Sequence, residues 1–591
     1  MNWVSQKGRL GIEFFALLFV IAIYLYPTLR ARNDLGATPL PPIFAPDLSL
    51  YLNVSNLVRV DDGEVINPYY RIPVPSEGSG YLKFRLAETW FGALNRLLRH
   101  QLPFSMVLWN SFWWGLLAVL ALGVFRRFLP VDSTAIVAAG LGLLMIFNFG
   151  ILKSLVLAWL HLPSLAAFEA LNLPFMRAFI PIVPCAFLMG YLGLQMENLI
   201  RPKISCFIGM AVLQLLALAI FPYATLMMAG TTMIAVLPRI RIAVRPSWLT
   251  PLLFGLACAL IDFAFVHHSS VSFYDNRASA IHFQPEVLPH LVGGNWLILV
   301  ALTIFVALTS LAPEVKWPLV GLGATNAVLM LGDAVVPATT ILLSHHSAHF
   351  VHFTAATMVV FLGTSILSVN RRRMRLGRLS LLMIIPLLLL NGVFLTVGTY
   401  RGFLTYNREL AGLSHVVRSL DHQKGDLLVA RSRDVDDPCG WIVLLSDAPV
   451  LFCTDAEVML TPPQNRQIHH FRQALYLYFT GKDSDSLRRA LSGGDPTNVM
   501  YRLGYWAEAV SPSAAERAAG VRSIETELLP LLTRVENHDP AAASFFRGYR
   551  RIVVIDTSQK PTFVPEKLAE LLNLEHQQRL NDWLISFYSA K

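Results

Sequence analysis

The sequence predicts a polytopic α-helical membrane protein with about eleven transmembrane helices, followed by a soluble α/β domain. Two observations support this prediction. The 591-residue chain is only 15% charged, whereas soluble proteins are about a quarter charged, and its mean hydropathy is +0.51. Apolar runs of about 17 to 20 residues recur through the N-terminal two thirds, and each is long enough to cross roughly 30 Å of hydrocarbon.

The first apolar run, residues 11–27, follows Lys7 and Arg9 and lacks a small-residue cleavage site. We therefore expect a retained signal anchor rather than a removed signal peptide. Ten further runs have the length of a membrane span. They lie near residues 106–125, 134–152, 178–195, 204–221, 223–238, 248–266, 294–312, 317–333, 349–368 and 379–398.

Loops rich in Lys and Arg set the expected orientation, because short cytoplasmic loops carry an excess of these residues. An even number of spans should separate neighbouring clusters. Residues 155–173 are apolar but would break this rule, and they contain Pro163 and Glu169, so we expect an outer interfacial or re-entrant segment there. We therefore expect a cytoplasmic N-terminus and a C-terminal tail on the outer side of the membrane. The expected membrane is a bacterial inner membrane. The clusters are Arg126-Arg127, Arg201 with Lys203, Arg239 with Arg241 and Arg245, Lys316, and Arg371 to Arg378.

The chain is expected to divide into a transmembrane domain at 1–399, with an outer loop at 28–105, and an extracytoplasmic α/β domain at 400–591. In the tail, short apolar runs predict buried strands, and the segments around them have helical periodicity. Predicted strands begin at Asp426, Trp441 and Arg551, and predicted helices lie near 465–480, 513–533 and 564–588. Disulfides persist outside the cell membrane, so a bridge between Cys439 and Cys453 stays open.

Residues 81–100 alternate apolar and basic faces with a helical period. Such a helix either lies in the membrane interface, with its Arg and Lys toward lipid head groups, or packs on the tail domain. The formal net charge is +9, but many of the basic residues lie in short loops where they set topology. The expected partner is therefore membrane lipid, and no nucleic acid is expected.

Asp47 is the main candidate for chemistry in the first outer loop. It has apolar neighbours, and Pro41, Pro42 and Pro46 hold the approach to it in an extended conformation. A partly desolvated carboxylate can act as a general base on a hydroxyl group. The alternative is a helix N-cap for residues 48–57, because Asp is a preferred capping residue.

Other ionisable residues lie near the predicted outer ends of the spans. Asp262 and Asp333 lie near two of these ends, where an ionisable group usually faces a cavity or a partner. Arg71, Arg177 and Arg277 have the chemistry to bind a lipid phosphate through paired hydrogen bonds. The alternative for each arginine is snorkelling to the membrane interface.

Half of the sixteen histidines fall in two regions that the topology places outside. His345 and His349 have i,i+4 spacing, and with His346 they are candidates to line a site for a sugar or phosphate. A divalent metal is the alternative. The chain contains no HExxH motif and few acidic neighbours here, so no metal or other cofactor is expected.

The order of these parts resembles the GT-C superfamily of integral-membrane glycosyltransferases. One span is followed by the loop motif Pro46-Asp47-Leu-Ser-Leu-Tyr51, an interfacial helix, and a second span that ends in Arg126-Arg127. The resemblance implies that Asp47 is the catalytic or acceptor-binding acid and that Tyr51 belongs to the substrate site. It also implies a polyprenyl-phosphate-linked sugar donor. Leu48 stands where many family members have Glu.

The resemblance implies an inverting transfer of the sugar to an extracytoplasmic glycan, lipid or protein. Three other functions stay open. A lipid-linked glycan flippase or transporter would distribute ionisable groups through the membrane, and a polymerase or ligase would have a large loop between late spans. A non-enzymatic scaffold for envelope assembly would use the tail for docking. Release of free polyprenyl phosphate would distinguish a transferase from a flippase.

Overall fold

The computed structural model is mostly helical, with a small sheet near the C-terminus. It describes most of the chain, with gaps. The described residues are 6–36, 40–44, 48–57, 65–66, 69–71, 73–74, 86–129, 142–147, 173–239, 253, 257, 260, 284–335, 343–368, 371–420, 425–431, 438–446, 448–453, 463–493, 496–505, 508–509, 511, 513–558 and 561–591.

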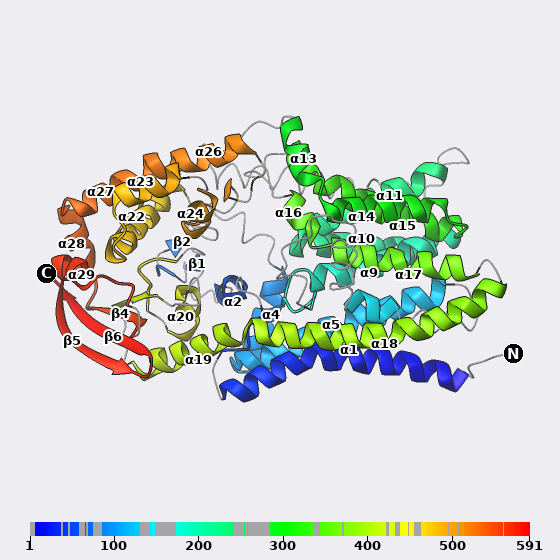
Figure 1. Cartoon of the computed structure of the whole chain (residues 1–591), viewed down its shortest axis with the longest axis horizontal. Coiled ribbons are helices and arrows are strands. Elements are labelled where there is room, and N and C mark those ends of the chain that lie inside the picture. The colour runs from blue at the N-terminus through cyan, green and yellow to red at the C-terminus, as the bar shows by residue number, and fades with distance from the viewer. Residues whose placement is uncertain are drawn as a thin grey trace.

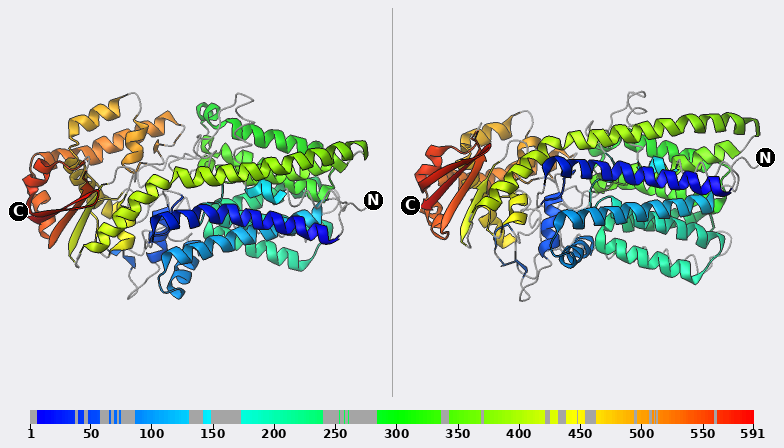
Figure 2. Two further views of the ribbon diagram at one scale, coloured as in Figure 1. Left: turned by 60° about the horizontal axis from the view of Figure 1, so that its bottom comes forward. Right: turned by 90° about the horizontal axis from the view of Figure 1, so that it is seen from below.

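Within these residues, four helices are long and apolar enough to cross a membrane, or five if a bent pair counts as one span. The bent pair joins Pro285–Leu291 to α14 (Gly294–Leu308) at 83°. Figure 1 shows these helices in one elongated bundle, and both views of Figure 2 show α1, α5 and α18 side by side. The four are α1 (Gln6–Leu35), α5 (Leu102–Phe128), α17 (Val351–Ser368) with the end of α16 (Leu343–Ala348), and α18 (Arg371–Gly402) continuing into α19 (Leu404–Ser419).

Shorter apolar helices complete the bundle. The spans expected at 134–152 and 248–266, and the segment at 155–173, lie wholly or mostly outside the described residues. Close packing depends on small residues: a Cβ added at Gly321 would lie 2.6 Å from the carbonyl oxygen of Thr231, which only glycine avoids. The shorter helices are α9 (Ile182–Ile200), α10 (Ile204–Ile220), α11 (Pro222–Val236) and α15 (Pro313–Met330).

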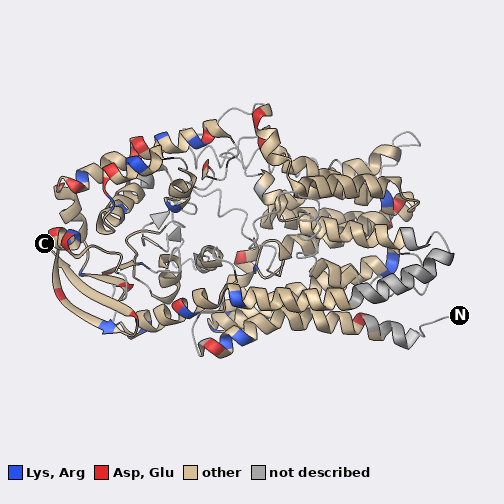
Figure 3. Ribbon diagram, in the orientation of Figure 1, with Lys and Arg blue, Asp and Glu red and all other residues tan. Residues whose placement is uncertain are grey.

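Charged residues lie at the ends of the bundle. Figure 3 shows them there and on the tail, while the middle of the described helices is almost free of them. Near the N-terminal end, Arg126 Nε donates to the Glu13 carboxylate at 2.8 Å, and Arg127 Nε donates to Glu197 at 3.0 Å. Lys203 lies 3.7 Å from the same Glu197 carboxylate. Two of the predicted cytoplasmic clusters therefore meet at one end of the molecule.

The loop between α1 and α5, which the sequence predicts to lie outside the membrane, contains short elements at the other end of the bundle. The predicted helix at 81–100 is α4 (Leu86–Leu97), which packs against α2 (Leu48–Leu57) and α5. Its buried face includes Phe91 and Gly92, and Leu97 is exposed. Two short antiparallel strands, β1 (Val65–Ile66) and β2 (Pro73–Val74), form a small ribbon in the same loop.

The tail contains a four-stranded sheet with the order β3-β4-β6-β5. β3 pairs parallel to β4, and β6 pairs antiparallel to both β4 and β5. Residues 428, 553 and 585 point into the core that continues into the bundle, whereas 427, 552 and 554 point into a second core formed by tail helices. The strands are β3 (Asp426–Ala430), β4 (Arg551–Thr557), β5 (Leu572–Leu580) and β6 (Trp583–Ala590).

Two predictions for the tail were wrong. The apolar run at Trp441 forms a short helix, α20 (Cys439–Leu445), not a strand, because it is buried between α2 and α19. A run this short carries no period that separates a strand from a buried helix. The helix predicted at 564–588 ends early as α29 (Pro565–Leu571), and the rest forms the β5–β6 hairpin. Trp583, Ile585 and Phe587 are every second residue of β6, and all three point into one core, as expected for the two-residue period of a strand.

The remaining tail helices share the second apolar core with the face of the sheet that points away from the bundle core. The helices predicted near 465–480 and 513–533 are present, the second with a one-turn π-helical segment at Ile524–Leu528. Cys439 and Cys453 are buried as thiols in one core. The tail helices are α22 (Pro463–Phe479), α23 (Ser484–Ser492), α24 (Thr497–Arg502), α26 (Ala514–Ser523), α27 (Leu529–Glu536) and α28 (Pro540–Arg547).

Candidate functional site

A backbone segment at residues 173–181 lies between the helices of the bundle and is held from several sides. On α5, Trp109 Nε1 donates to the carbonyl oxygen of Ala178 at 2.7 Å, and Trp114 Nε1 donates to that of Phe175 at 2.9 Å. The amide of Phe175 donates to the Tyr24 hydroxyl at 3.3 Å. Because these side chains hold its backbone, this non-helical segment has a defined path.

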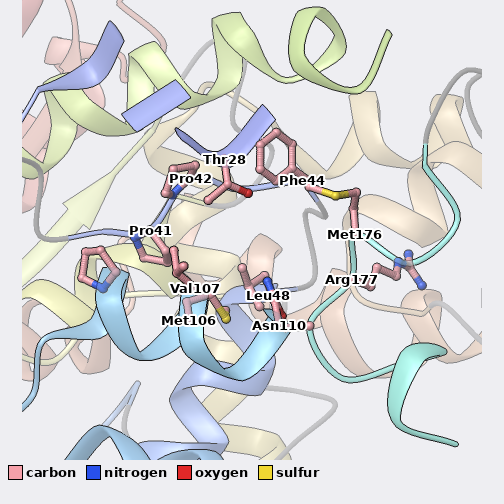
Figure 4. A pocket seen from close by; sticks show the side chains of 12 residues that line it. Thr28, Pro41, Pro42, Phe44, Leu48, Met106, Val107, Asn110, Met176 and Arg177 are labelled. Atoms are coloured by element: carbon pink, nitrogen blue, oxygen red, sulfur yellow. The ribbon is translucent and has the colours of Figure 1, made fainter. Parts of the chain in front are cut away.

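The same segment presents Arg177 to a narrow pocket beside the C-terminal part of α1 and the N-terminal part of α5. Figure 4 shows Arg177 at the edge of this pocket, with its guanidinium extending away from the apolar side chains. Arg177 is half-buried. The pocket is lined by Thr28, Pro41, Pro42, Phe44, Leu48, Pro103, Met106, Val107, Asn110, Met176, Arg177 and Ala178.

Two side chains hold the chain on either side of Asp47. Asn407 of α19 pairs with the backbone of Ile43: its Oδ1 accepts from the amide and its Nδ2 donates to the carbonyl, both at 2.8 Å. On α2, Asn53 Nδ2 donates to the Gly440 carbonyl at 2.8 Å. The loop that contains Asp47 is thus anchored to α19 before it and to α20 after it.

Asp47 itself lies outside the described residues. Phe44 and Leu48, the nearest described residues before and after it in the sequence, both line the pocket. Tyr51, one turn further along α2, is half-buried, and its ring packs on Phe179 at 5.3 Å between centroids. Tyr51 therefore packs against the segment that carries Arg177.

Asp333 and the histidines form a second group, around α16. Asp333 is buried and accepts hydrogen bonds from the amide of Ser344, at 3.1 Å, and from its hydroxyl. The rings of His346 and His349 are 6.2 Å apart, and His346 packs on Tyr223 at 4.3 Å. The ring contacts make His346 part of an aromatic cluster with Phe221, Tyr223 and His349.

Arg71 lies away from both groups, at the contact between the first loop and the tail. It is exposed, and its guanidinium donates to the Ser446 carbonyl at 3.4 Å. Beside it, the Tyr70 hydroxyl is 2.6 Å from His469 Nδ1 on α22, and the Arg472 guanidinium stacks over the Tyr70 ring at 4.4 Å. This surface joins the loop to the tail.

Four candidate residues cannot be placed. Asp262 and Arg277, like Asp47, lie outside the described residues, and the side chain of His345 is not described. Among the residues that are described, no group of three His, Cys, Asp or Glu side chains could hold a metal ion. The candidate site therefore rests on Arg177, Tyr51 and the pocket.

Several residues that line the pocket were not among those predicted from the sequence. Asn110 follows Trp109 in an apolar helix and is 8% exposed, and Thr28 is 7% exposed. A polar side chain inside an apolar run was the available signal, since a buried amide needs hydrogen-bond partners. With a cation at its edge and an amide and a hydroxyl among apolar walls, the pocket has the chemistry to bind an anionic, hydroxyl-bearing group.

No protein-family model matches the chain, and no curated protein matches it either.

Proposed function

We propose that this chain is a GT-C-type glycosyltransferase of a bacterial inner membrane. It would transfer a sugar from a polyprenyl-phosphate-linked donor to an extracytoplasmic glycan, lipid or protein. The proposal includes eleven spans, a cytoplasmic N-terminus and an extracytoplasmic tail. It makes Asp47 the general base and Arg177 the group that binds the phosphate.

One observation supports this function above the others. Arg177 lies at the edge of a pocket that Phe44 and Leu48, on either side of Asp47 in the sequence, also line. A cation beside apolar walls suits a lipid phosphate, because the guanidinium pairs with the phosphate oxygens in a fixed geometry. Trp109 and Asn407 hold the two backbone segments, so the site would be preorganised.

The reaction would be a single displacement. Asp47 takes the proton from an acceptor hydroxyl, and the acceptor oxygen attacks the anomeric carbon. The bond between that carbon and the phosphate oxygen breaks, and its electron pair leaves with the polyprenyl phosphate. Arg177 stabilises the charge that develops on this leaving group. One displacement inverts the anomeric configuration.

The test measures the release of free polyprenyl phosphate by the purified full-length protein in lipid nanodiscs. We expect Asp47→Asn to lower the release rate by about 100-fold or more, the range of general-base catalysis, while the protein still inserts and folds. Asp34→Asn is the matched control, since Asp34 lies near the outer end of α1, is paired with Arg30, and is not among the residues lining the pocket. Turnover by Asp47→Asn at the wild-type rate would exclude the proposed base.

A second variant tests the phosphate site without requiring turnover. Arg177→Gln should weaken the binding of farnesyl phosphate by about 10-fold to 100-fold, because a charge-assisted hydrogen bond is lost. Arg30→Gln is the control, as Arg30 is a half-exposed arginine of α1 that does not line the pocket. Equal losses in both variants would point to a general effect of surface charge and would contradict a specific role for Arg177.

A further inference from the structure

Asn110 carries the least satisfied polar group of the pocket. Its side chain is 8% exposed, and its Oδ1 has no hydrogen-bond partner in the described part of the chain. Met106 and Val107, on the preceding turn of α5, line the same pocket. A buried polar atom in a native protein is almost always paired, so an unpaired one facing a pocket indicates a group that arrives from outside.

The position of Asn110 relative to Arg177 restricts what that group can be. Both residues line one pocket, but Arg177 lies at its edge with the guanidinium directed away from the apolar walls (Figure 4). Arg177 would hold an anion at that edge. Asn110 would then contact the chemical group that is covalently bonded to the anion. An amide donates and accepts hydrogen bonds, as a hydroxyl does, so the two are complementary.

We propose that Asn110 binds one hydroxyl group of the sugar whose phosphate Arg177 holds, and that it thereby selects the sugar. The inference rests on the proposed function, because it takes the ligand to be a lipid-linked sugar. The pocket is narrow, so one hydroxyl-bearing edge of the ring would enter it. A site that pairs a buried group with a ligand hydroxyl discriminates strongly against ligands that lack it, since the buried group is then left unpaired.

The experiment measures equilibrium binding of farnesyl phosphate and of farnesyl-phosphate hexoses to the full-length protein in nanodiscs, without acceptor. The hexose series includes the parent sugar and its single deoxy analogues. We expect Asn110→Leu to weaken binding of the parent hexose probe by about tenfold, the worth of one hydrogen bond, and to leave binding of farnesyl phosphate unchanged. One deoxy analogue should bind equally to the wild type and to Asn110→Leu.

Asn295→Leu is the matched control. Asn295 lies in α14, is 6% exposed, also has an Oδ1 without a partner among the described residues, and is not among the pocket residues. It should change neither affinity. If Asn110→Leu does not fold, Asn110→Ala takes its place with the same expectations.

Three results would overturn the inference. They are equal loss of both probes in the Asn110 variant, equal loss of every deoxy analogue, and no preference of the wild type for the hexose probe over farnesyl phosphate. Failure of the proposed function looks different. Hexose-dependent binding that requires Asn110, with no transfer to any acceptor, would leave the sugar site standing and exclude the transferase.

Discussion

Asp426 is a fully buried carboxylate at the start of β3, and two arginines of β4 and its approach compensate its charge. Arg550 Nη2 lies 3.1 Å from Oδ1, and Arg551 Nη2 lies 2.7 Å from Oδ2. Arg551 is also the residue paired with Asp426 in the parallel ladder. The ion pairs therefore fix the register of β3 on β4 through side chains as well as backbone.

We expect Asp426→Asn to destabilise the tail by about 3 kcal/mol, in the range for breaking a buried ion pair, because two arginines lose their counter-charge. The measurement is the thermal unfolding midpoint of the purified protein, followed by intrinsic fluorescence. Asp485→Asn serves as control, since the Asp485 side chain is 77% exposed and its pair with Arg488 spans 3.9 Å. An unchanged midpoint for Asp426→Asn would show that the backbone ladder alone holds β3.

At the scale of single residues, the sequence singled out Arg177, which lines the pocket, but not Asn110 or Asn407. An arginine just before an apolar run stands out by its charge, whereas Asn110 lies inside one and is not charged. Asn407 acts on Ile43, more than three hundred positions earlier in the chain, and the sequence alone does not bring the two together. Charged candidates stand out in the sequence, whereas hydrogen bonds between residues far apart in the chain do not.

Among the elements, the segment at 173–181 contains neither helix nor strand, yet side chains of α1 and α5 hold its backbone. The carbonyl groups of Phe175 and Ala178 accept hydrogen bonds from the two indoles of α5, while those of Phe179 and Pro181 accept from amides of α9. The hydrogen bond from Trp109 reaches Ala178, the residue next to Arg177. Removing it should loosen Arg177 without changing the chemistry of its side chain.

We therefore expect Trp109→Phe to weaken farnesyl phosphate binding by about 5-fold to 10-fold, in line with one hydrogen bond. Trp113→Phe is a close control, because Trp113 lies on the same helix, is 3% exposed, and its Nε1 has no hydrogen-bond partner among the described residues. Both changes remove similar ring volume. If the two variants lose affinity equally, the loss comes from packing and not from the Trp109 hydrogen bond.

The elements predicted from periodicity were largely those that the structure contains. The long apolar helices at α1, α5 and α17 and the strands β3 and β4 lie where the sequence predicted them. The errors fell on α20 and on the β5–β6 hairpin. Both are short elements whose form depends on neighbours: α20 lies between two helices, and β6 completes the ladder of β4. The local sequence pattern does not show which neighbours a short element will pack against or pair with.

For the whole molecule, the tail and the bundle are joined by packed surfaces. The apolar core of the bundle continues into one face of the sheet, through Trp441 and Val553. Tyr70 of the first loop contacts His469 of α22 through their hydroxyl and ring nitrogen. The tail and the N-terminus lie at opposite ends of this body (Figure 1).

This arrangement leads to a test of orientation with single cysteines. Asp485→Cys in α23 of the tail should react with a membrane-impermeant maleimide in intact spheroplasts, and Arg201→Cys, near the opposite end, should react only after permeabilisation. The native cysteines Cys185, Cys206, Cys439 and Cys453 are buried and should give little background. Cys258 lies outside the described residues and is replaced by Ser.

This labelling pattern is expected because basic loops stay in the cytoplasm. Arg201 belongs to such a basic cluster, in which Glu197 pairs with both Arg127 and Lys203. Labelling of both positions before permeabilisation would mean that the reagent crosses the membrane or that the helices do not span it. Labelling of Arg201→Cys alone would reverse the topology. The tail, the pocket and Asp47 would then face the cytoplasm, and an extracytoplasmic acceptor would be excluded.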